Sequence, residues 1–460
     1  WVDCIGPAGE NLVRYSIMQC NKRSSFNKTG IGTIMGSKNL KAIAARGTKG
    51  VAVADPKKFK QLTHEITKRI VADPQLENFR TWGFGDTSGR TGFTYKEFFE
   101  RIAKKPYACP SCPVACKALI ELKGGKYEGL SYRISGLFAL SNCNKPAEVE
   151  NWDELAKCVE LENRYGLEAC GTAGVLNYLV ECYEHGILTE DQIGFVPERG
   201  SKALHELVPV IARKQGIGAL LAEGMLRASQ KVNKDSEQYA LHVKGVGSAY
   251  SVQMLETEVS ISTIGSLTNP RGGHNDSARF PLGDGTTVGA SPEIIRRFCA
   301  DLDLRKEVAD RVCEGSEGFN VGRLIKWSED YTSAYVSTGL CIKEIIMRNI
   351  DLKKLSELYA AATGLEINPA QLLEAGERVF NVLKAFNVRA GATRRDDLPS
   401  RGAAWPPDKQ LIMAGKGYGT LDDILSEYYE ERGWNIESGI PTRQRLNALG
   451  LQSLADDIGV

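Results

Sequence analysis

A short run of residues with three cysteines constrains this chain more than any other feature of its sequence. Residues 109–116 read Cys-Pro-Ser-Cys-Pro-Val-Ala-Cys, so two and then three residues separate the thiols. A loop this tight can bring three thiolates onto three irons of one cubane, and its prolines stiffen it. A fourth ligand must come from elsewhere, and we expect it to be Cys341. The sequence therefore predicts a [4Fe-4S] cluster held by Cys109, Cys112, Cys116 and Cys341.

Zinc is the alternative metal for these thiols. Structural zinc usually takes two Cys-x2-Cys pairs or a mixed set of cysteines and histidines. Here no second pair exists, and the histidines are scattered, at positions 64, 185, 205, 242 and 274. The spacing therefore favours iron. The chain has 12 cysteines. Because it is large and opens without a secretion signal, we expect them to be reduced in the cytoplasm, most as small buried side chains.

Length and charge limit the class of protein. With 460 residues the chain is too long for one core, so two or three domains are expected. The formal net charge of +1 gives no field that favours nucleic acid or an anionic membrane. No segment approaches the roughly 18 apolar residues of a membrane helix. The chain opens at Trp1 inside a strand-and-loop segment, so we expect a fragment, or a separate chain that supplies the rest of the first domain.

Hydrophobic periodicity predicts a mostly helical protein. The first 50 residues are glycine-rich, with short apolar runs such as 41–45 that suit strands. Asp55 and Pro56 mark the start of a helix that reaches Val71. Further helices are expected over 146–165, 171–185, 204–229, 292–302, 352–362, 369–387 and 420–432. A zone rich in glycine, serine and asparagine, 244–284, separates two groups of helices. The predicted domains are 1–50, 51–250 and 251–460.

Motifs spread along the chain resemble, in order, those of one family. They read IGPAGEN at 5–11, GIGTIMGSK at 30–38, YGLE at 165–168, FNVR at 386–389, DLP at 397–399, YYEERGW at 428–434 and GIPT at 439–442, besides the cysteine loop. Together they resemble the aldehyde:ferredoxin oxidoreductase family, whose members hold tungsten between two pterin-dithiolenes (molybdopterin) beside a four-iron cluster. The resemblance implies a mainly α chain, with two helical domains preceded by the tail of a β-rich domain that forms a base under the pterins.

Two further segments resemble the pterin motifs of that family. Asn163-Arg-Tyr-Gly166-Leu167-Glu168 is similar to Asp/Asn-x-x-Gly-Leu-Asp, which implies that Asn163 and Glu168 bond the ring nitrogens and exocyclic amine of one pterin. Taken alone, this hexamer is typical of a helix C-terminus. The second motif, Asp-x-x-Gly-Leu-Cys, is matched by Gly339, Leu340 and the cysteine that follows, but valine replaces its aspartate at 336.

Phosphate and proton-transfer residues also follow from the resemblance. Arg23 and Ser24 lie in the region that binds the pterin phosphates in family members. The resemblance also implies Mg²⁺ between the phosphates of the two pterins. His274, in Arg-Gly-Gly-His, resembles the family's Arg-Gly-x-x-His pattern and can transfer protons near neutral pH. Tyr132 and Arg133 are weaker catalytic candidates. The alternatives are that His274 only forms hydrogen bonds within a glycine-rich loop, and that Arg133 is only a surface residue.

The substrate is less constrained than the cofactors. The resemblance implies an oxidoreductase that converts an aldehyde to a carboxylic acid or the reverse, with tungsten or molybdenum, and passes electrons to ferredoxin or an iron–sulfur partner under anaerobic conditions. The family's glutamate after the third cysteine has no counterpart in Ser-Tyr-Arg-Ile at 131–134. This favours a reductase of an aromatic or acyl coenzyme A thioester, related to the benzoyl-coenzyme A reductase catalytic subunit, whose own cysteine ligand is also absent. The third possible function is that of a pterin-free electron-transfer subunit. We also expect the protein to be an oligomer.

Overall fold

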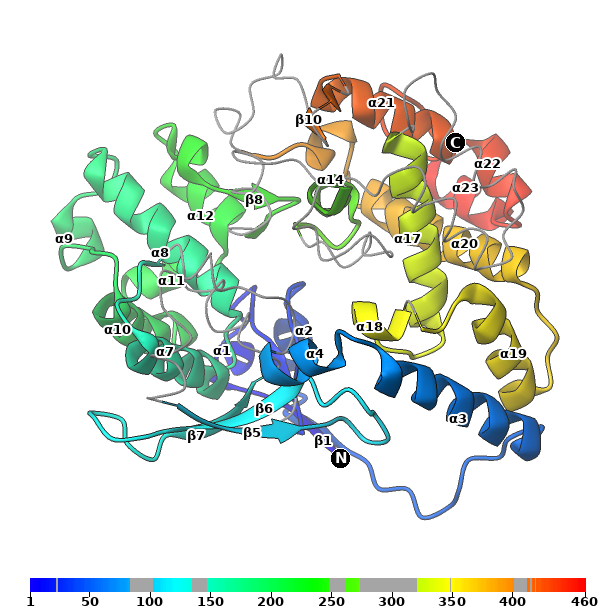
Figure 1. Ribbon diagram of the computed structural model, residues 1–460. Coiled ribbons are helices and arrows are strands. Elements are labelled where there is room, and N and C mark those ends of the chain that lie inside the picture. The colour runs from blue at the N-terminus through cyan, green and yellow to red at the C-terminus, as the bar shows by residue number, and fades with distance from the viewer. Residues whose placement is uncertain are drawn as a thin grey trace. The chain divides into compact units, whose positions relative to one another are not determined.

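The computed structural model describes residues 1–21, 24–82, 102–134, 147–247, 261–273, 321–347, 349–400, 412–413, 416–417 and 419–460. The chain divides into two compact units (Figure 1). Unit 1 comprises Trp1–Lys49 and Pro74–Val252, and unit 2 comprises Gly50–Asp73 and Gln253–Val460. Helices predominate and a short β part lies at the N-terminus, so the predicted fold class is confirmed. The domain division at residues 50 and 250 stays a prediction.

A small antiparallel sheet begins unit 1. Its strands are β1 (Val2–Ile5), β2 (Met18–Cys20), β3 (Ser24–Phe26) and β4 (Ala42–Ala44), in the order β3-β2-β1-β4. The strand predicted over 41–45 is confirmed as β4. Helices α1 (Pro7–Glu10) and α2 (Ile31–Ser37) pack so closely that a Cβ on Gly36 would clash with the carbonyl oxygen of Gly9. Glycines at this crossing let the two backbones touch.

A second sheet in unit 1 carries the cysteine loop and was not predicted. It consists of β5 (Ile102–Tyr107), β6 (Lys117–Leu122) and β7 (Ser131–Ile134), all antiparallel. On β6, Ala118, Ile120 and Leu122 are buried and alternate with more exposed residues, as a strand with one covered face requires. These side chains join the main core of unit 1.

Helices make up the rest of unit 1. They are α4 (Leu76–Trp82), α7 (Trp152–Tyr165), α8 (Ala169–Glu184), α9 (Glu190–Ile193), α10 (Ser201–Ala212), α11 (Ile217–Leu221) and α12 (Met225–Val232), followed by the hairpin β8 (His242–Val243) and β9 (Val246–Gly247). The helix predicted from 146 begins only at Trp152, because the side chain of Asn151 caps it by accepting from the N–H of Glu154. The single helix predicted over 204–229 is wrong. Gly216 and Gly224 have φ of 50° and 76° and break it into three.

Unit 2 is helical. Its helices are α3 (Pro56–Ala72), α14 (Ile261–Thr268), α17 (Val321–Ser337), α18 (Glu344–Met347), α19 (Leu352–Thr363), α20 (Pro369–Arg389), α21 (Leu421–Arg432), α22 (Arg443–Ala448) and α23 (Gln452–Ile458), with the short strands β10 (Ile412–Met413) and β11 (Lys416–Gly417). Four predicted helices are confirmed, as α3, α19, α20 and α21. Helix α14 lies inside the zone predicted to interrupt the helices, so that zone is partly helical. The helix predicted over 292–302 lies outside the described residues. Among the described residues, no helix combines the length and apolarity needed to cross a membrane.

Helices α17 and α20 pack closely in unit 2. A Cβ on Gly376 would clash with the carbonyl oxygen of Asp330 and lie 2.8 Å from the backbone nitrogen of Ala334. We expect Gly376→Ala to lower the free energy of unfolding by about 1–3 kcal/mol, because the helices must separate to admit the methyl group. Chemical denaturation measures this, with Gly50→Ala in the same unit as control, since nothing lies within 4 Å of that position. Equal effects of the two substitutions would contradict the packing argument.

Candidate functional site

The three clustered cysteines lie on one hairpin loop. Strands β5 and β6 pair up to Tyr107 and Lys117, so residues 108–116 form the connection. Ser111 and Ala115, each just before a cysteine, have φ of 58° and 52°. Left-handed non-glycine residues are uncommon and gather at ligand sites. They turn the chain twice within the loop.

The loop has a defined conformation. The N–H of Cys112 donates to the carbonyl oxygen of Cys109 (3.1 Å), and Arg80 on α4 donates to the carbonyl oxygen of Pro113 (3.2 Å). The side chain of Val114 is buried and anchors the loop to unit 1. Cys109 is exposed, while Cys112 and Cys116 are half-buried. Partly accessible thiols on a fixed loop are suited to metal ligation.

The three loop cysteines suit an iron–sulfur cluster, and Cys341 stays the predicted fourth ligand. Cys109, Cys112, Cys116 and Cys341 are all free of disulfides. Cys341 belongs to unit 2, where it is exposed just beyond α17. In the described part of the chain, no three His, Cys, Asp or Glu side chains are gathered closely enough to hold a single metal ion. A cubane needs less crowding than a single zinc, because each thiolate binds a different iron.

The predicted pterin segment joins α7 to α8. Gly166 is the left-handed C-cap of α7 (φ 78°), as the plain reading of the hexamer expects. Its position has a second requirement, because a Cβ there would lie 2.9 Å from the backbone nitrogen of Gly6. The N–H of Ile17 donates to its carbonyl oxygen at 2.9 Å. The segment is thus tied to the N-terminal sheet region, and Leu167 is buried there.

Two partners of this segment were missed in the sequence. The carboxylate of Glu168 is buried, caps α8 by accepting from the N–H of Gly171 (2.6 Å), and pairs with the buried ammonium of Lys28 (3.4 Å). Asn163 is half-buried and accepts a hydrogen bond from Gln19 (2.7 Å). Lys28 and Gln19 precede their partners by more than 100 residues, so no local pattern could reveal them. Asn163 and Glu168 thus each have a polar partner from the N-terminal part of unit 1.

Ser24 contacts the strand that follows the cysteine loop. It lies on β3, and its hydroxyl accepts a hydrogen bond from Lys117, the first residue of β6 after the loop. A basic side chain therefore stands beside the residue predicted to meet a phosphate. Arg23 lies outside the described residues.

Two of the predicted catalytic residues, Tyr132 and Arg133, make contacts in unit 1. The hydroxyl of Tyr132 donates to the backbone carbonyl oxygen of Ala156 on α7 (2.7 Å), and burial raises its pKa. The guanidinium of Arg133 is exposed and lies 4.7 Å from the ring centroid of Tyr107. His274 lies outside the described residues. A pocket of about 450 Å³ lined by α9, α11 and α12 contains none of the predicted site residues.

The second predicted motif lies at the end of α17. Val336 is exposed, and Gly339 has φ of 82°, so the helix ends in a left-handed turn that only glycine adopts easily. Leu340 is half-buried and Cys341 is exposed. A turn with an exposed thiol is compatible with metal ligation.

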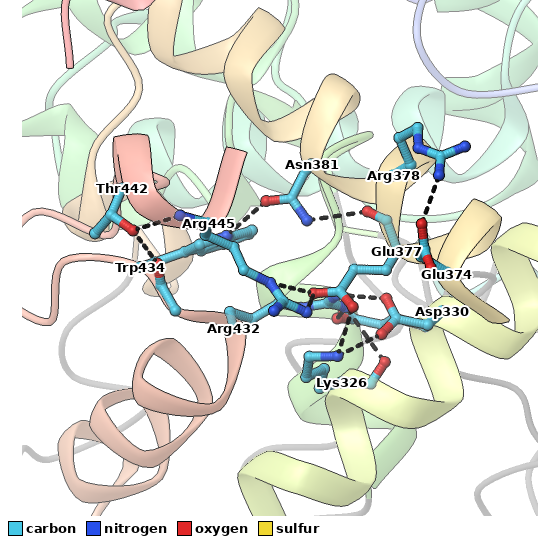
Figure 2. Close-up of polar contacts among 12 residues, drawn as sticks. Lys326, Asp330, Glu374, Glu377, Arg378, Asn381, Arg432, Trp434, Thr442 and Arg445 are labelled. Atoms are coloured by element: carbon cyan, nitrogen blue, oxygen red, sulfur yellow. Dashed lines mark hydrogen bonds and ion pairs between the residues drawn. The ribbon is translucent and has the colours of Figure 1, made fainter. Parts of the chain in front are cut away.

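A buried charge network in unit 2 was also missed (Figure 2). Arg432 on α21 is fully buried and pairs with Glu329 (2.6 Å) and Asp330 on α17, while its Nε donates to the hydroxyl of Tyr428 (3.1 Å). Lys326 pairs with Asp330 at 2.8 Å. Buried charges are stable only when paired in this way.

This network also holds the segment that precedes His274. The hydroxyl of Thr268, at the end of α14, donates to Glu329 (2.6 Å). Asn387 on α20 donates to the carbonyl oxygen of Pro270 (2.6 Å). Two helices therefore fix residues 268–270 through side chains.

Comparison with known proteins identifies relatives along the whole chain. Residues 2–47 match the N-terminal domain of aldehyde ferredoxin oxidoreductase, and residues 61–451 match its domains 2 and 3. The tungsten-containing aldehyde ferredoxin oxidoreductases of Pyrococcus horikoshii and Pyrococcus furiosus are each 28% identical, over 97% of this chain and 73% of the relative. The aliphatic sulfonate oxidoreductase, WOR-like subunit, of P. furiosus is 26% identical over 97% of this chain and 69% of its own length.

A solved structure has the same fold. It is the active site complex BamBC of benzoyl coenzyme A reductase with 1,5-dienoyl-CoA, with a TM-score of 0.75 and 22% identity, over 99% of this chain and 74% of that one. The likeness supports the helical fold and its short β part. At this identity it does not extend to a substrate.

Proposed function

The chain belongs to the aldehyde ferredoxin oxidoreductase family, and we propose that it is a tungsten- or molybdenum-pterin oxidoreductase that interconverts an aldehyde and a carboxylic acid. Electrons would pass through a [4Fe-4S] cluster to ferredoxin or another iron–sulfur partner. The observation that carries the proposal is the loop of three cysteines without disulfides, fixed by Arg80 and Val114, in the same unit as Asn163 and Glu168. The metal and pterins, when bound, supply the two-electron chemistry.

The residues of the chain have distinct tasks in this proposal. Cys109, Cys112 and Cys116 hold the cluster, with Cys341 as the fourth ligand. Asn163 and Glu168 hold the polar edge of one pterin. Lys28 pairs with the buried carboxylate of Glu168, which also accepts a hydrogen bond from the N–H of Gly171.

Further tasks fall to the residues around the phosphates and the substrate. Ser24 and Arg23 would bind the pterin phosphates with Mg²⁺, and Gly339 and Leu340 would approach the second pterin. His274 would transfer the proton, with Tyr132 and Arg133 as weaker candidates. Because Tyr132 already donates to the backbone of α7, we favour His274.

A reductase of an aromatic or acyl coenzyme A thioester is the second candidate function. The residues of β7, Ser131–Ile134, carry no carboxylate where the aldehyde enzymes have one, and Arg133 is exposed where it can meet an anion. A pterin-free electron-transfer subunit is the remaining alternative. Each of the three candidates predicts a different metal content or substrate.

Metal analysis followed by a substrate panel tests the proposal. Tungsten, molybdenum, iron and zinc are quantified per chain in anaerobically purified protein. We expect about four irons, as one cubane requires, with one tungsten or molybdenum. Aldehydes are then compared with coenzyme A thioesters, using redox dyes as electron carriers. Turnover of thioesters alone selects the second candidate, iron without the heavier metal selects the third, and zinc without iron rejects all of them.

A further inference from the structure

The ring of Tyr15 is held between two glycines beside the predicted pterin segment. A Cβ on Gly171 would lie 3.1 Å from its Cδ2 atom, and a Cβ on Gly224 would lie 3.8 Å from its Cδ1 atom. The same Cβ on Gly171 would lie 3.1 Å from Oε2 of Glu168. The tyrosine ring and the Glu168 carboxylate therefore rest against one glycine, at the start of α8.

The backbone fixes this position from both sides. The carbonyl oxygen of Tyr15 accepts a hydrogen bond from the N–H of Glu168 (3.2 Å). The next residue, Ser16, forms an isolated antiparallel β-bridge with Leu167. On the other side the N–H of Arg14 donates to the carbonyl oxygen of Ala222 (3.0 Å), and its side chain pairs with Glu223 (2.7 Å). Backbone hydrogen bonds thus hold Tyr15 next to the segment that carries Glu168.

The hydroxyl of Tyr15 is buried and, among the residues that the structure describes, has no hydrogen-bond partner. Leaving such a group unpaired is unfavourable, and buried hydroxyls in native proteins nearly always have a partner. Burial, with the nearby charges of Glu162 and Glu168, raises its pKa, so the hydroxyl keeps its proton. In the described part of the chain it is a hydrogen-bond donor without an acceptor, near the carboxylates of Glu162 and Glu168.

We propose that the Tyr15 hydroxyl donates a hydrogen bond to the polar edge of the bound pterin. This rests on the proposed function, in which Glu168 binds the same heterocycle. A pterin presents ring nitrogens and a carbonyl oxygen, so it offers acceptors to a tyrosine and donors to a carboxylate. One ring edge can then satisfy both Tyr15 and Glu168, which share the surface of Gly171.

The substitution Tyr15→Phe separates binding from folding. Removing the hydroxyl removes an unpaired group from the cofactor-free chain but a hydrogen bond from the loaded one. We therefore expect pterin and tungsten (or molybdenum) to leave the variant about five- to tenfold faster during anaerobic gel filtration, the factor that one hydrogen bond supplies. Oxidised-pterin fluorescence and metal analysis measure the loss. The thermal midpoint of the cofactor-free chain should stay the same or rise.

Tyr178→Phe is the matched control. Its hydroxyl is buried in the same unit and already bonds to Ser236 (3.0 Å), so its loss should lower the thermal midpoint with and without cofactor and leave the pterin loss rate unchanged. Equal pterin loss from wild type and Tyr15→Phe, or a lowered midpoint of cofactor-free Tyr15→Phe, would overturn the inference about Tyr15 alone. Wild-type protein without pterin would overturn the proposed function as well.

Discussion

Replacing Arg432 by methionine is expected to lower the free energy of unfolding by about 3–5 kcal/mol, the cost of removing one partner from a buried ion pair. Methionine fills much of the same space but supplies no charge. Glu329 and Asp330, both buried, would lose their shared guanidinium. The ring of Phe380, whose centroid lies 4.2 Å from the guanidinium, would lose a cation contact as well.

The pH dependence of this loss identifies its cause. Burial already raises the pKa of Glu329 above its ordinary value, although Arg432, Thr268 and Tyr428 counteract it. Without the guanidinium this pKa rises further. A carboxyl whose folded pKa exceeds its unfolded pKa stabilises the fold at low pH and loses that contribution as pH rises through the folded value. The deficit of Arg432→Met should therefore be smaller at about pH 5 than at about pH 8.

Denaturation followed by tryptophan fluorescence measures the effect, since Trp434 lies in the same cluster (Figure 2). Arg69→Met in unit 2 is the matched control. Arg69 forms an exposed pair with Glu65 on α3, so its loss should cost no more than about 0.5 kcal/mol. A deficit below about 1 kcal/mol for Arg432→Met, or one that grows on acidification, would contradict the assigned role of the network.

This network shows what the sequence could not reveal. Lys326 contacts Glu377 (3.2 Å), which also pairs with Arg445. Burial alone would raise the pKa of Glu377, but Lys326, Arg445 and Arg432 outweigh it and lower that pKa. Glu377 and Arg445 are 68 residues apart, and Glu329 and Arg432 are 103 residues apart, so no periodicity marks these pairs. The motif at 428–434 was recognised only as a resemblance, and its buried arginine gives it a physical role.

Predictions of helix boundaries from local sequence signals were more successful. Asp55 caps α3 as predicted, and Thr420 with Asp423 forms a capping box where the helix over 420–432 was predicted to begin. Each signal spans only a few residues. The helix predicted over 204–229 failed because its apolar periodicity was given more weight than Gly216 and Gly224. The sheet β5–β7 was missed although Ala118, Ile120 and Leu122 alternate with more exposed residues on β6, a pattern that marks a strand.

The residues of the candidate site, too, could be predicted from the sequence only where a local pattern marks them. The cysteine loop could be predicted because three ligands fall within eight residues. Asn163 and Glu168 were found through a motif, but their partners Gln19 and Lys28 depend on tertiary contacts. Tyr15 gave no signal, since an unpaired hydroxyl is a property of the folded chain alone.

The double substitution Cys112→Ala/Cys116→Ala is expected to remove the iron. Two of the four predicted ligands would be lost, and the remaining thiolates cannot hold a cubane. We expect iron to fall from about four per chain to below one, with loss of the visible absorption of the cluster. Both are measured on anaerobically purified protein.

Cys158→Ala/Cys182→Ala is the matched control. Both thiols are fully buried in the helices of unit 1, and burial raises the pKa of Cys182 to about 11, so they stay protonated and do not bind metal. This variant should keep its iron. Cys341→Ala tests the fourth ligand separately and should release iron from one corner of the cubane. If the control loses as much iron as the loop variant, the cluster does not lie at the loop. If the loop variant instead loses zinc, the thiols hold a single structural ion and the electron-transfer role of the loop is wrong.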